Sequence, residues 1–263
     1  MTSELLRPRW IVTTLLVVAA VALMLRLGLW QLDRLEQRRA LNSRLEVALN
    51  APPLDMNEDV PAVEDLPDYE YRTVVVSGRF DADQSVLLRN QIWEGRLGYH
   101  LFTPLLIDGT GRAVWVNRGW VPQEQGLDVP APEGTVTLTG MLRREPARQS
   151  IGGPPADRPA EGETRINAWN RIDLAGMAEQ TDLDLLPVYI QQAPVEGQGQ
   201  PPYASLPEIE ITEGSHLGYA LQWFAFAAVL GIGYPFFVRR QLREASMRNT
   251  GVLAETAAPL KGE

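Results

Sequence analysis

Residues 10–30 read WIVTTLLVVAAVALMLRLGLW and residues 217–238 read LGYALQWFAFAAVLGIGYPFFV, and these two apolar segments decide the architecture of the chain. A helix of about 20 apolar residues spans the hydrocarbon core of a bilayer. Both segments have this length, so they predict two transmembrane helices in contact with membrane lipid. The intervening residues 31–216 are mostly polar. The sequence therefore predicts a membrane hairpin whose single central domain is held at the membrane by both of its ends.

The charges that flank the two segments predict the orientation of the hairpin. Arginines lie on the flanks that face away from the central domain: Arg7, Arg9, Arg239, Arg240 and Arg243. Positive flanks are retained in the cytoplasm, and long domains are translocated largely regardless of their own charge. The arginines that follow the first segment are mixed with acidic residues and do not reverse this prediction. We expect residues 1–9 and 239–263 to be cytoplasmic and residues 31–216 to be extracytoplasmic, in a multi-pass protein of the plasma membrane.

A cleaved signal peptide is the alternative interpretation of the first segment. The apolar run from Trp10 to Leu25 is longer than the core of a usual signal peptide, and no small-x-small cleavage site follows it. We therefore expect a permanent anchor, with Trp30 at the membrane interface.

Composition excludes several classes of function. Gln31 to Ser215 contain 29 acidic residues and 16 arginines, a net charge of −13, and nucleic-acid binding needs a basic face. The absence of cysteine excludes disulfides, thiolate catalysis and CxxC metal sites. His100 and His216 are the only histidines, so a multi-histidine metal site within one chain is not expected. No hydrolase, metalloprotease or nucleotide-binding motif is present, and we expect a protein that is not an enzyme.

The central domain has a helical beginning and a strand-like remainder. Apolar residues at positions 41, 45, 48 and 49 share one helix face, which predicts that the first helix continues as a stalk that ends before Pro52. Strands are expected at residues 71–76, 85–90, 98–107, 112–117, 135–142 and 185–191. Asp108–Gly111 is typical of a hairpin turn, and Asp173 is typical of a helix N-cap. We predict a membrane α+β fold whose domain is a mainly antiparallel sheet, or is barrel-like, with short helices and a proline-rich loop at 146–164.

His216 is the strongest candidate for chemistry because it lies at the outer mouth of the second segment. A neutral imidazole is a common axial ligand of haem iron. On a continuous helix, Tyr219, Ala220 and Trp223 would share its face, where a flat macrocycle could rest. The alternative is an interfacial histidine that is placed there for its polar tip, and spacing alone favours this alternative.

Two polar residues in the predicted strands are weaker candidates. We interpret His100 as a structural histidine within a sheet, with ligation or proton transfer as the alternative. Arg118 lies in Asn117–Pro122, where we expect a strand to end abruptly, and its permanent charge needs a partner or solvent. A structural ion pair is the favoured interpretation of Arg118, and an acidic partner or a haem propionate is the alternative.

The two transmembrane helices themselves have features that would let them pair. Small residues in the second segment permit close helix approach. In an antiparallel pair, Trp30 and Gln31 would face Trp223 and Gln222. The alternative is two independent anchors.

Five short motifs occur together in this chain. They are Gly28-Leu29-Trp30-Gln31-Leu32 with Arg34, Gly78-Arg79-Phe80, Gly98-Tyr99-His100 with Thr103-Pro104-Leu105, Val116-Asn117-Arg118-Gly119-Trp120-Val121-Pro122, and His216 with Tyr219-Ala220 and Gln222-Trp223-Phe224. In order and in layout the chain resembles the Surfeit locus protein 1 family of cytochrome c oxidase assembly factors, over residues from about 10 to 245. It departs from the family at Gln222, where many relatives have threonine.

The resemblance implies a non-enzymatic assembly factor that assists delivery of haem a to subunit I of cytochrome c oxidase, or its insertion there, alongside the haem a synthesis machinery. It implies His216 as the iron ligand, and under this hypothesis Tyr219 and Trp223 pack on the ring while Arg118 contacts a propionate or a partner. One alternative is a membrane scaffold that holds an unfinished oxidase subunit without binding haem. Another is a membrane-anchored enzyme that uses His100 with an exterior carboxylate.

Overall fold

The computed structural model describes residues 8–58, 60–147, 157–159 and 164–256, and the chain divides into two compact units. The helical unit comprises Met1–Ser43 and Ile211–Glu263, and the β unit comprises Arg44–Glu210. Residues 1–7 and 257–263 of the two predicted cytoplasmic ends lie outside the described residues, as does most of the predicted loop at 146–164.

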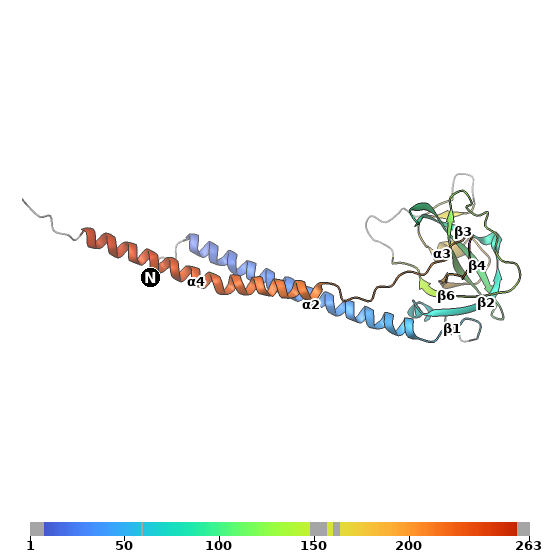
Figure 1. Cartoon of the computed structure of the whole chain (residues 1–263), viewed down its shortest axis with the longest axis horizontal. Helices are drawn as coiled ribbons and strands as arrows, with labels where there is room; N and C mark the ends of the chain where they lie inside the picture. Colours follow the sequence, from blue (N-terminus) through green and yellow to red (C-terminus); the bar gives the residue numbers. More distant parts are fainter. Residues whose placement is uncertain (1–7, 59, 148–156, 160–163, 257–263) are drawn as a thin grey trace, which may run out of the picture. The chain divides into compact units, whose positions relative to one another are not determined.

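Two long helices make up the helical unit: α2 (Pro8–Asn50) and α4 (His216–Thr256) (Figure 1). Each is long and apolar enough to cross a membrane, and few residues of its apolar stretch are buried. The predicted continuation of the first helix to just before Pro52 is confirmed. The second helix runs beyond Val238, because the residues that follow are rich in good helix formers such as arginine, glutamine, leucine and alanine.

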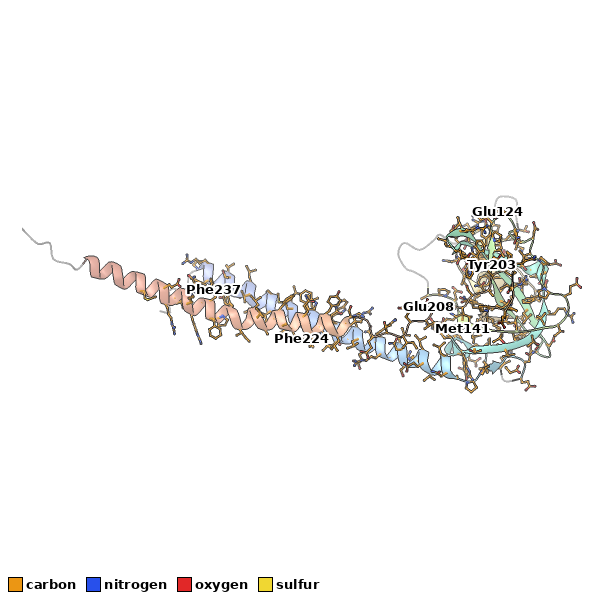
Figure 2. The ribbon with its side chains drawn as sticks, in the orientation of Figure 1. Glu124, Met141, Tyr203, Glu208, Phe224 and Phe237 are labelled. Atoms are coloured by element: carbon orange, nitrogen blue, oxygen red, sulfur yellow. The ribbon has the colours of Figure 1, made fainter. Side chains whose placement is uncertain are left out.

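The two helices pack against each other in antiparallel directions. Gly28 lies directly against the ring of Phe224, which a side chain at position 28 would displace. Towards the other end, the hydroxyls of Thr14 and Tyr234 are 2.7 Å apart. Phe224 and Phe237, both labelled in Figure 2, project from α4 within this pair. The helices are therefore not independent anchors, and small residues at the contact permit the close approach.

The β unit contains eight described strands and three short helices. The strands are β1 (Leu54–Asp55), β2 (Thr73–Phe80), β3 (Val86–Trp93), β4 (Arg96–Ile107), β5 (Ala113–Pro122), β6 (Val136–Arg144), β7 (Ala168–Trp169) and β8 (Leu185–Gln192). The helices are η1 (Leu66–Tyr69), η2 (Ala82–Gln84) and α3 (Leu174–Ala178), and the side chain of Asp173 caps α3 as predicted by accepting from Gly176 N at 3.1 Å.

Five of the strands close into a small barrel. The sheet order is β1-β2-β6-β8-β5-β4-β3-β7, and β2 also pairs with β4, so β2, β6, β8, β5 and β4 form a ring. Closure removes the unpaired strand edges that would otherwise favour association with other chains. The predicted barrel-like, mainly antiparallel domain is confirmed, although β5 and β8 run parallel.

Strand β5 differs from its prediction because it does not end after Asn117. It pairs with β4 as far as Gly98↔Pro122, and the register shifts where Leu101 faces Gly119 and Phe102 faces Asn117. Arg118 is therefore the extra residue of a β-bulge. Gly119 has a φ of 123°, which accommodates the bend without a side-chain clash. The expectation of an abrupt end is wrong because the bulge absorbs the irregular sequence and pairing then resumes.

An aromatic stack holds the segment after β8 against this bulge. The backbone of Tyr203 exchanges hydrogen bonds with Trp120, and its ring stacks between Trp120 and Trp93 at centroid distances of 6.2 and 6.0 Å. Tyr203 is labelled in the β unit in Figure 2. The segment that connects β8 to α4 is thus anchored to the barrel at Tyr203.

Three apolar clusters stabilise the described part of the β unit, and the smallest contains Leu87, Leu101, Val121 and Val129. The largest is formed by β1, β2, β4, β5, β6 and β8 with η1, and it contains Leu66, Leu105 and Ile190, all fully buried. The second contains Phe102 and Trp115 with residues of β8 and α3. The alternation of buried and half-buried residues along β2 follows from the two-residue repeat of a strand, with one side facing the core.

Candidate functional site

His216 is the first residue of α4 and is half-buried beside α2. Its Nδ1 atom lies 2.9 Å from Oε1 of Gln31. A carboxamide oxygen has no hydrogen to donate, so Nδ1 carries the proton and donates to it. The neutral ring then has an unprotonated Nε2, which is the form of imidazole that binds metals. The sequence placed Gln31 opposite Gln222; the structure instead gives Gln31 the histidine as its partner.

The side of the imidazole that carries Nε2 lies near Gly214. A Cβ built at position 214 would lie 3.6 Å from Cδ2 and 3.7 Å from Nε2 of His216. Gly214 has a φ of 66°, a conformation that favours glycine. The residue that the backbone favours here also leaves open the space beside the ring edge that a Cβ would contact.

Tyr219 and Trp223 lie on the same helix as His216, one and two turns further on. Tyr219 is exposed, and Trp223 is half-buried with its ring edge-on to Phe226 at 6.2 Å. Ala220, which the sequence grouped with them, is completely buried and cannot contact a ligand. The structure therefore provides two aromatic side chains near His216 but not the small-residue surface.

A polar cluster, which sequence reasoning missed, fixes the chain just before α4. Arg39 donates to both carboxylate oxygens of Glu213 at 2.7 and 2.9 Å. Arg38 Nε and Asn42 Nδ2 each donate to the carbonyl oxygen of Thr212 at 3.0 Å. The hydrogen bond from Arg39 lowers the pKa of Glu213. The sequence signal was a spacing of three and four residues along α2, from Gln31 to Leu35, Arg38 and Asn42, which places these residues on one face.

Arg118 belongs to the β unit, not to the helical unit that contains the other three predicted site residues. It is 5% exposed, its Nη2 donates to Pro130 O at 2.7 Å, and its guanidinium lies 5.2 Å from the centre of the Phe80 ring. Burial lowers its pKa to about 10, so it remains charged at neutral pH. The favoured ion pair is wrong for the described residues, because a carbonyl and an aromatic face contact the guanidinium instead.

His100 lies on β4, where it contacts the neighbouring strand β5. The amide of Gly119 donates to Asn117 Oδ1 at 3.1 Å, which leaves Asn117 Nδ2 to donate to His100 Nδ1, also at 3.1 Å. Burial lowers the pKa of His100 to about 4, so the ring is neutral at pH 7. Among the described residues no carboxylate hydrogen-bonds to it, and its surroundings are those of a structural histidine.

No group of three or more histidine or acidic side chains with metal-binding geometry occurs among the residues that the structure describes. The start of α4 offers a single point of attachment, the imidazole nitrogen Nε2 of His216, to a group that needs one protein ligand. Haem suits such a point, because the porphyrin supplies four ligands of its own and needs only axial ones from protein.

The fold is that of a small β-barrel protein flanked by two apolar helices, and comparison with known proteins identifies its family. Residues 18–228 match the SURF1 family model. A SURF1-like protein of Mycobacterium tuberculosis is 30% identical over 255 residues, which cover 94% of this chain and 90% of that protein. Surfeit locus protein 1 of Mus musculus is 27% identical over 81% of this chain and 72% of its own length. This chain belongs to the SURF1 family.

A third relative has a descriptive name. The cytochrome oxidase assembly protein SHY1 of Saccharomyces cerevisiae is 32% identical over 99 residues, which cover 38% of this chain and 25% of that protein. The residues that carried the family resemblance, from Gly28 to Phe224, all fall within the matched range 18–228.

Proposed function

We propose that this chain is a membrane-anchored, non-enzymatic factor for the assembly of cytochrome oxidase. Membership of the SURF1 family and the name of the yeast relative support this role. The two apolar helices support membrane anchoring. The arginines outside the two spans support cytoplasmic termini and an extracytoplasmic β unit at the plasma membrane. The partners in this proposal are oxidase subunit I and the haem a synthesis machinery.

The specific task that we propose is delivery of haem a to subunit I, or assistance with its insertion. The hydrogen bond between Gln31 and His216 carries this proposal, because it leaves Nε2 with a free lone pair at the membrane-proximal end of α4. When bound, haem a supplies a redox iron whose use belongs to the oxidase. This chain contributes one nitrogen ligand, and a single protein ligand suits a carrier that must release its cargo.

Tyr219 and Trp223 are the proposed contacts for the plane of the macrocycle. Their positions three and seven residues after His216 bring them to the same flank of the helix. Tyr219 is 51% exposed, so it can cover a ligand without first leaving a packed core. Contact between such aromatic side chains and a flat apolar ring is favourable.

Arg118 is a weaker part of the proposal. Its Nη1 is buried and has no hydrogen-bond partner among the described residues. A propionate or a partner carboxylate would satisfy this donor if the bulge opened. In the closed barrel, Arg118 stabilises the bulge through Pro130 and Phe80.

The test is an optical spectrum of the detergent-purified protein after co-expression with the enzymes of haem a synthesis. We expect a Soret band in the wild type that is lost or shifted in His216→Ala. Gln222→Ala, at an exposed position of the same helix, is the matched control and should retain the band.

Two results would overturn haem delivery by His216. A Soret band that is identical in the wild type and in His216→Ala would place any haem elsewhere. No haem in the folded wild type, with haem a supplied, would leave a scaffold that holds an unfinished oxidase subunit.

A further inference from the structure

We propose that Gln31 is the positioning residue for His216, and that its side-chain oxygen selects the tautomer in which Nε2 is free to bind iron. This inference rests on the proposed role of His216 as a haem ligand. It adds a second residue, 185 positions away in the sequence, that acts through the histidine without touching the ligand.

The identity of the two atoms in contact gives the direction of the hydrogen bond. Gln31 Oε1 and His216 Nδ1 are 2.9 Å apart, which is the usual length of an N–H···O bond. The oxygen accepts, so the imidazole must donate from Nδ1. In a neutral ring the one available proton is then used, and Nε2 keeps its lone pair.

The edge of the ring that carries Nε2 faces Gly214, which has no side chain. A Cβ at position 214 would lie 3.6 Å from Cδ2 and 3.7 Å from Nε2 of His216. A Cβ at this position would make an ordinary van der Waals contact with this edge of the ring, and glycine leaves that space open. Gln31 thus selects the tautomer of the ring, and Gly214 leaves space beside Nε2.

The ring and the backbone of His216 are held by different residues. The pair Arg39–Glu213 and the bond from Asn42 to Thr212 O fix the chain three and four residues before the histidine. These contacts position the start of α4 but do not touch the imidazole. Loss of Gln31 should therefore alter the tautomer while leaving the helix start in place.

The tautomer matters to ligation in two ways. In this tautomer Nε2 would hold an iron through its lone pair, and no proton would have to leave the ring, because Nε2 carries none. An acceptor on Nδ1–H also fixes the ring orientation and makes the ligand more basic, and the loss of such partners typically weakens metal binding by about 10- to 100-fold.

The experiment uses selective 15N labelling of the two histidines in the full-length protein in detergent, without haem. Four ring nitrogens then report the two tautomers directly, because protonated and unprotonated ring nitrogens have well-separated shifts. We expect protonated Nδ1 in His216 of the wild type. Gln31→Leu should move His216 towards the Nε2-protonated form.

Two internal controls make the comparison specific. Gln37→Leu removes a glutamine of the same helix whose side-chain oxygen accepts from Arg34, and it should leave the His216 signals unchanged. The His100 signals should stay constant in every variant, which shows that the β unit remains folded. Gln31→Glu keeps an acceptor at the same distance and should restore the Nδ1-protonated form.

Titration with iron protoporphyrin IX then separates this inference from the proposed function. We expect Gln31→Leu to bind about 10- to 100-fold more weakly than the wild type, with recovery in Gln31→Glu. An Nδ1 that is unprotonated in the wild type, or a tautomer that does not respond to Gln31→Leu, would overturn the inference. A tautomer that responds in a protein that binds no iron porphyrin would support the action of Gln31 and reject the haem proposal.

Discussion

The two histidines of this chain each face a carboxamide, and the hydrogen bonds run in opposite directions. At the mouth of α4, His216 Nδ1 donates to the oxygen of Gln31. In the barrel, His100 Nδ1 accepts from the NH₂ group of Asn117. The first arrangement leaves Nε2 as a free acceptor, and the second leaves Nε2 protonated. A histidine beside a carboxamide is therefore a potential metal ligand in one case and a structural histidine in the other.

The surroundings of the carboxamide therefore determine which ring nitrogen of the histidine carries the proton. Asn117 cannot reverse its amide, because its oxygen is already occupied by the backbone N–H of Gly119 in the bulge. His100 is also buried enough for its pKa to fall to about 4, which removes the charged form from the physiological range. Presence of a histidine in a motif says little until the partner of each ring nitrogen is known.

The largest expected effect on stability comes from Gly119→Ala, which disrupts the bulge that orients Asn117. A Cβ here would overlap the backbone of Tyr203 and lie 2.5 Å from Ala204 N, and the φ of 123° adds strain. We expect the free energy of unfolding to fall by about 4 kcal/mol in denaturant titrations.

Gly109→Ala is the control for Gly119→Ala. Its φ is 80°, but nothing lies within 4 Å of the point that a Cβ would occupy, so it should lose only about 1 kcal/mol. Equal losses in the two variants would show that backbone strain alone, and not the contact with Tyr203, makes glycine necessary in the bulge.

The next effect is a dependence of stability on pH that comes from His100. Its pKa is about 4 in the folded protein and near 6.5 when unfolded, so the unfolded state binds more protons as the pH falls between these values. Stability from this source is complete above pH 6.5 and is lost as the pH falls towards 4, by about 3 kcal/mol in total.

The variant His100→Gln tests the assignment of this pH dependence. It removes the titration while the acidic groups still contribute, so its unfolding free energy should fall less steeply than that of the wild type between pH 6.5 and 4. Parallel profiles for the two proteins would show that His100 is less buried than the structure indicates.

The sequence predicted most of the fold where local patterns are strong. The apolar lengths predicted both long helices, the repeat from Leu41 to Leu49 predicted the stalk, and runs of strand-forming residues between turn signals predicted β2 to β6 and β8. It left an open sheet and a barrel as alternatives, because the pairing of β2 with β4 and of β5 with β8 depends on contacts distant in sequence. It also missed β1 and β7, which have two residues each and no detectable period.

The candidate site was only partly accessible to the same reasoning. His216 and Gln31 were both singled out by their motifs, but their contact requires the register of two helices, and helix periodicity gives a face without giving a register. The bulge at Arg118 was not predicted, because bulges have no reliable sequence pattern. An ion pair was expected instead, because the charge of Arg118 needs a partner. The carbonyl of Pro130 that it contacts is a backbone group, which carries no signal in residue types.

The smallest expected effect is a difference in stability between variants of two buried asparagines. Asn117 contacts His100, and Asn42 contacts the chain just before α4. Asn117→Leu removes the donor to His100 and the acceptor for Gly119 N, so two buried groups lose their partners, and we expect a loss of about 2 kcal/mol. Asn42→Leu removes one bond to Thr212 O, which still accepts from Arg38, and also removes an Oδ1 that is buried without a partner within the described residues.

Because Asn42→Leu leaves no described partner stranded, its loss should stay below about 1 kcal/mol, and the leucine can pack against the helix pair. Denaturant unfolding of the two variants beside the wild type measures the difference. A larger loss in Asn42→Leu than in Asn117→Leu would mean that the start of α4 is held more tightly than the contact between β4 and β5 at His100. His216 would then be a fixed structural element of the helix pair, as His100 is of the barrel, and not a ligand that can exchange its partner.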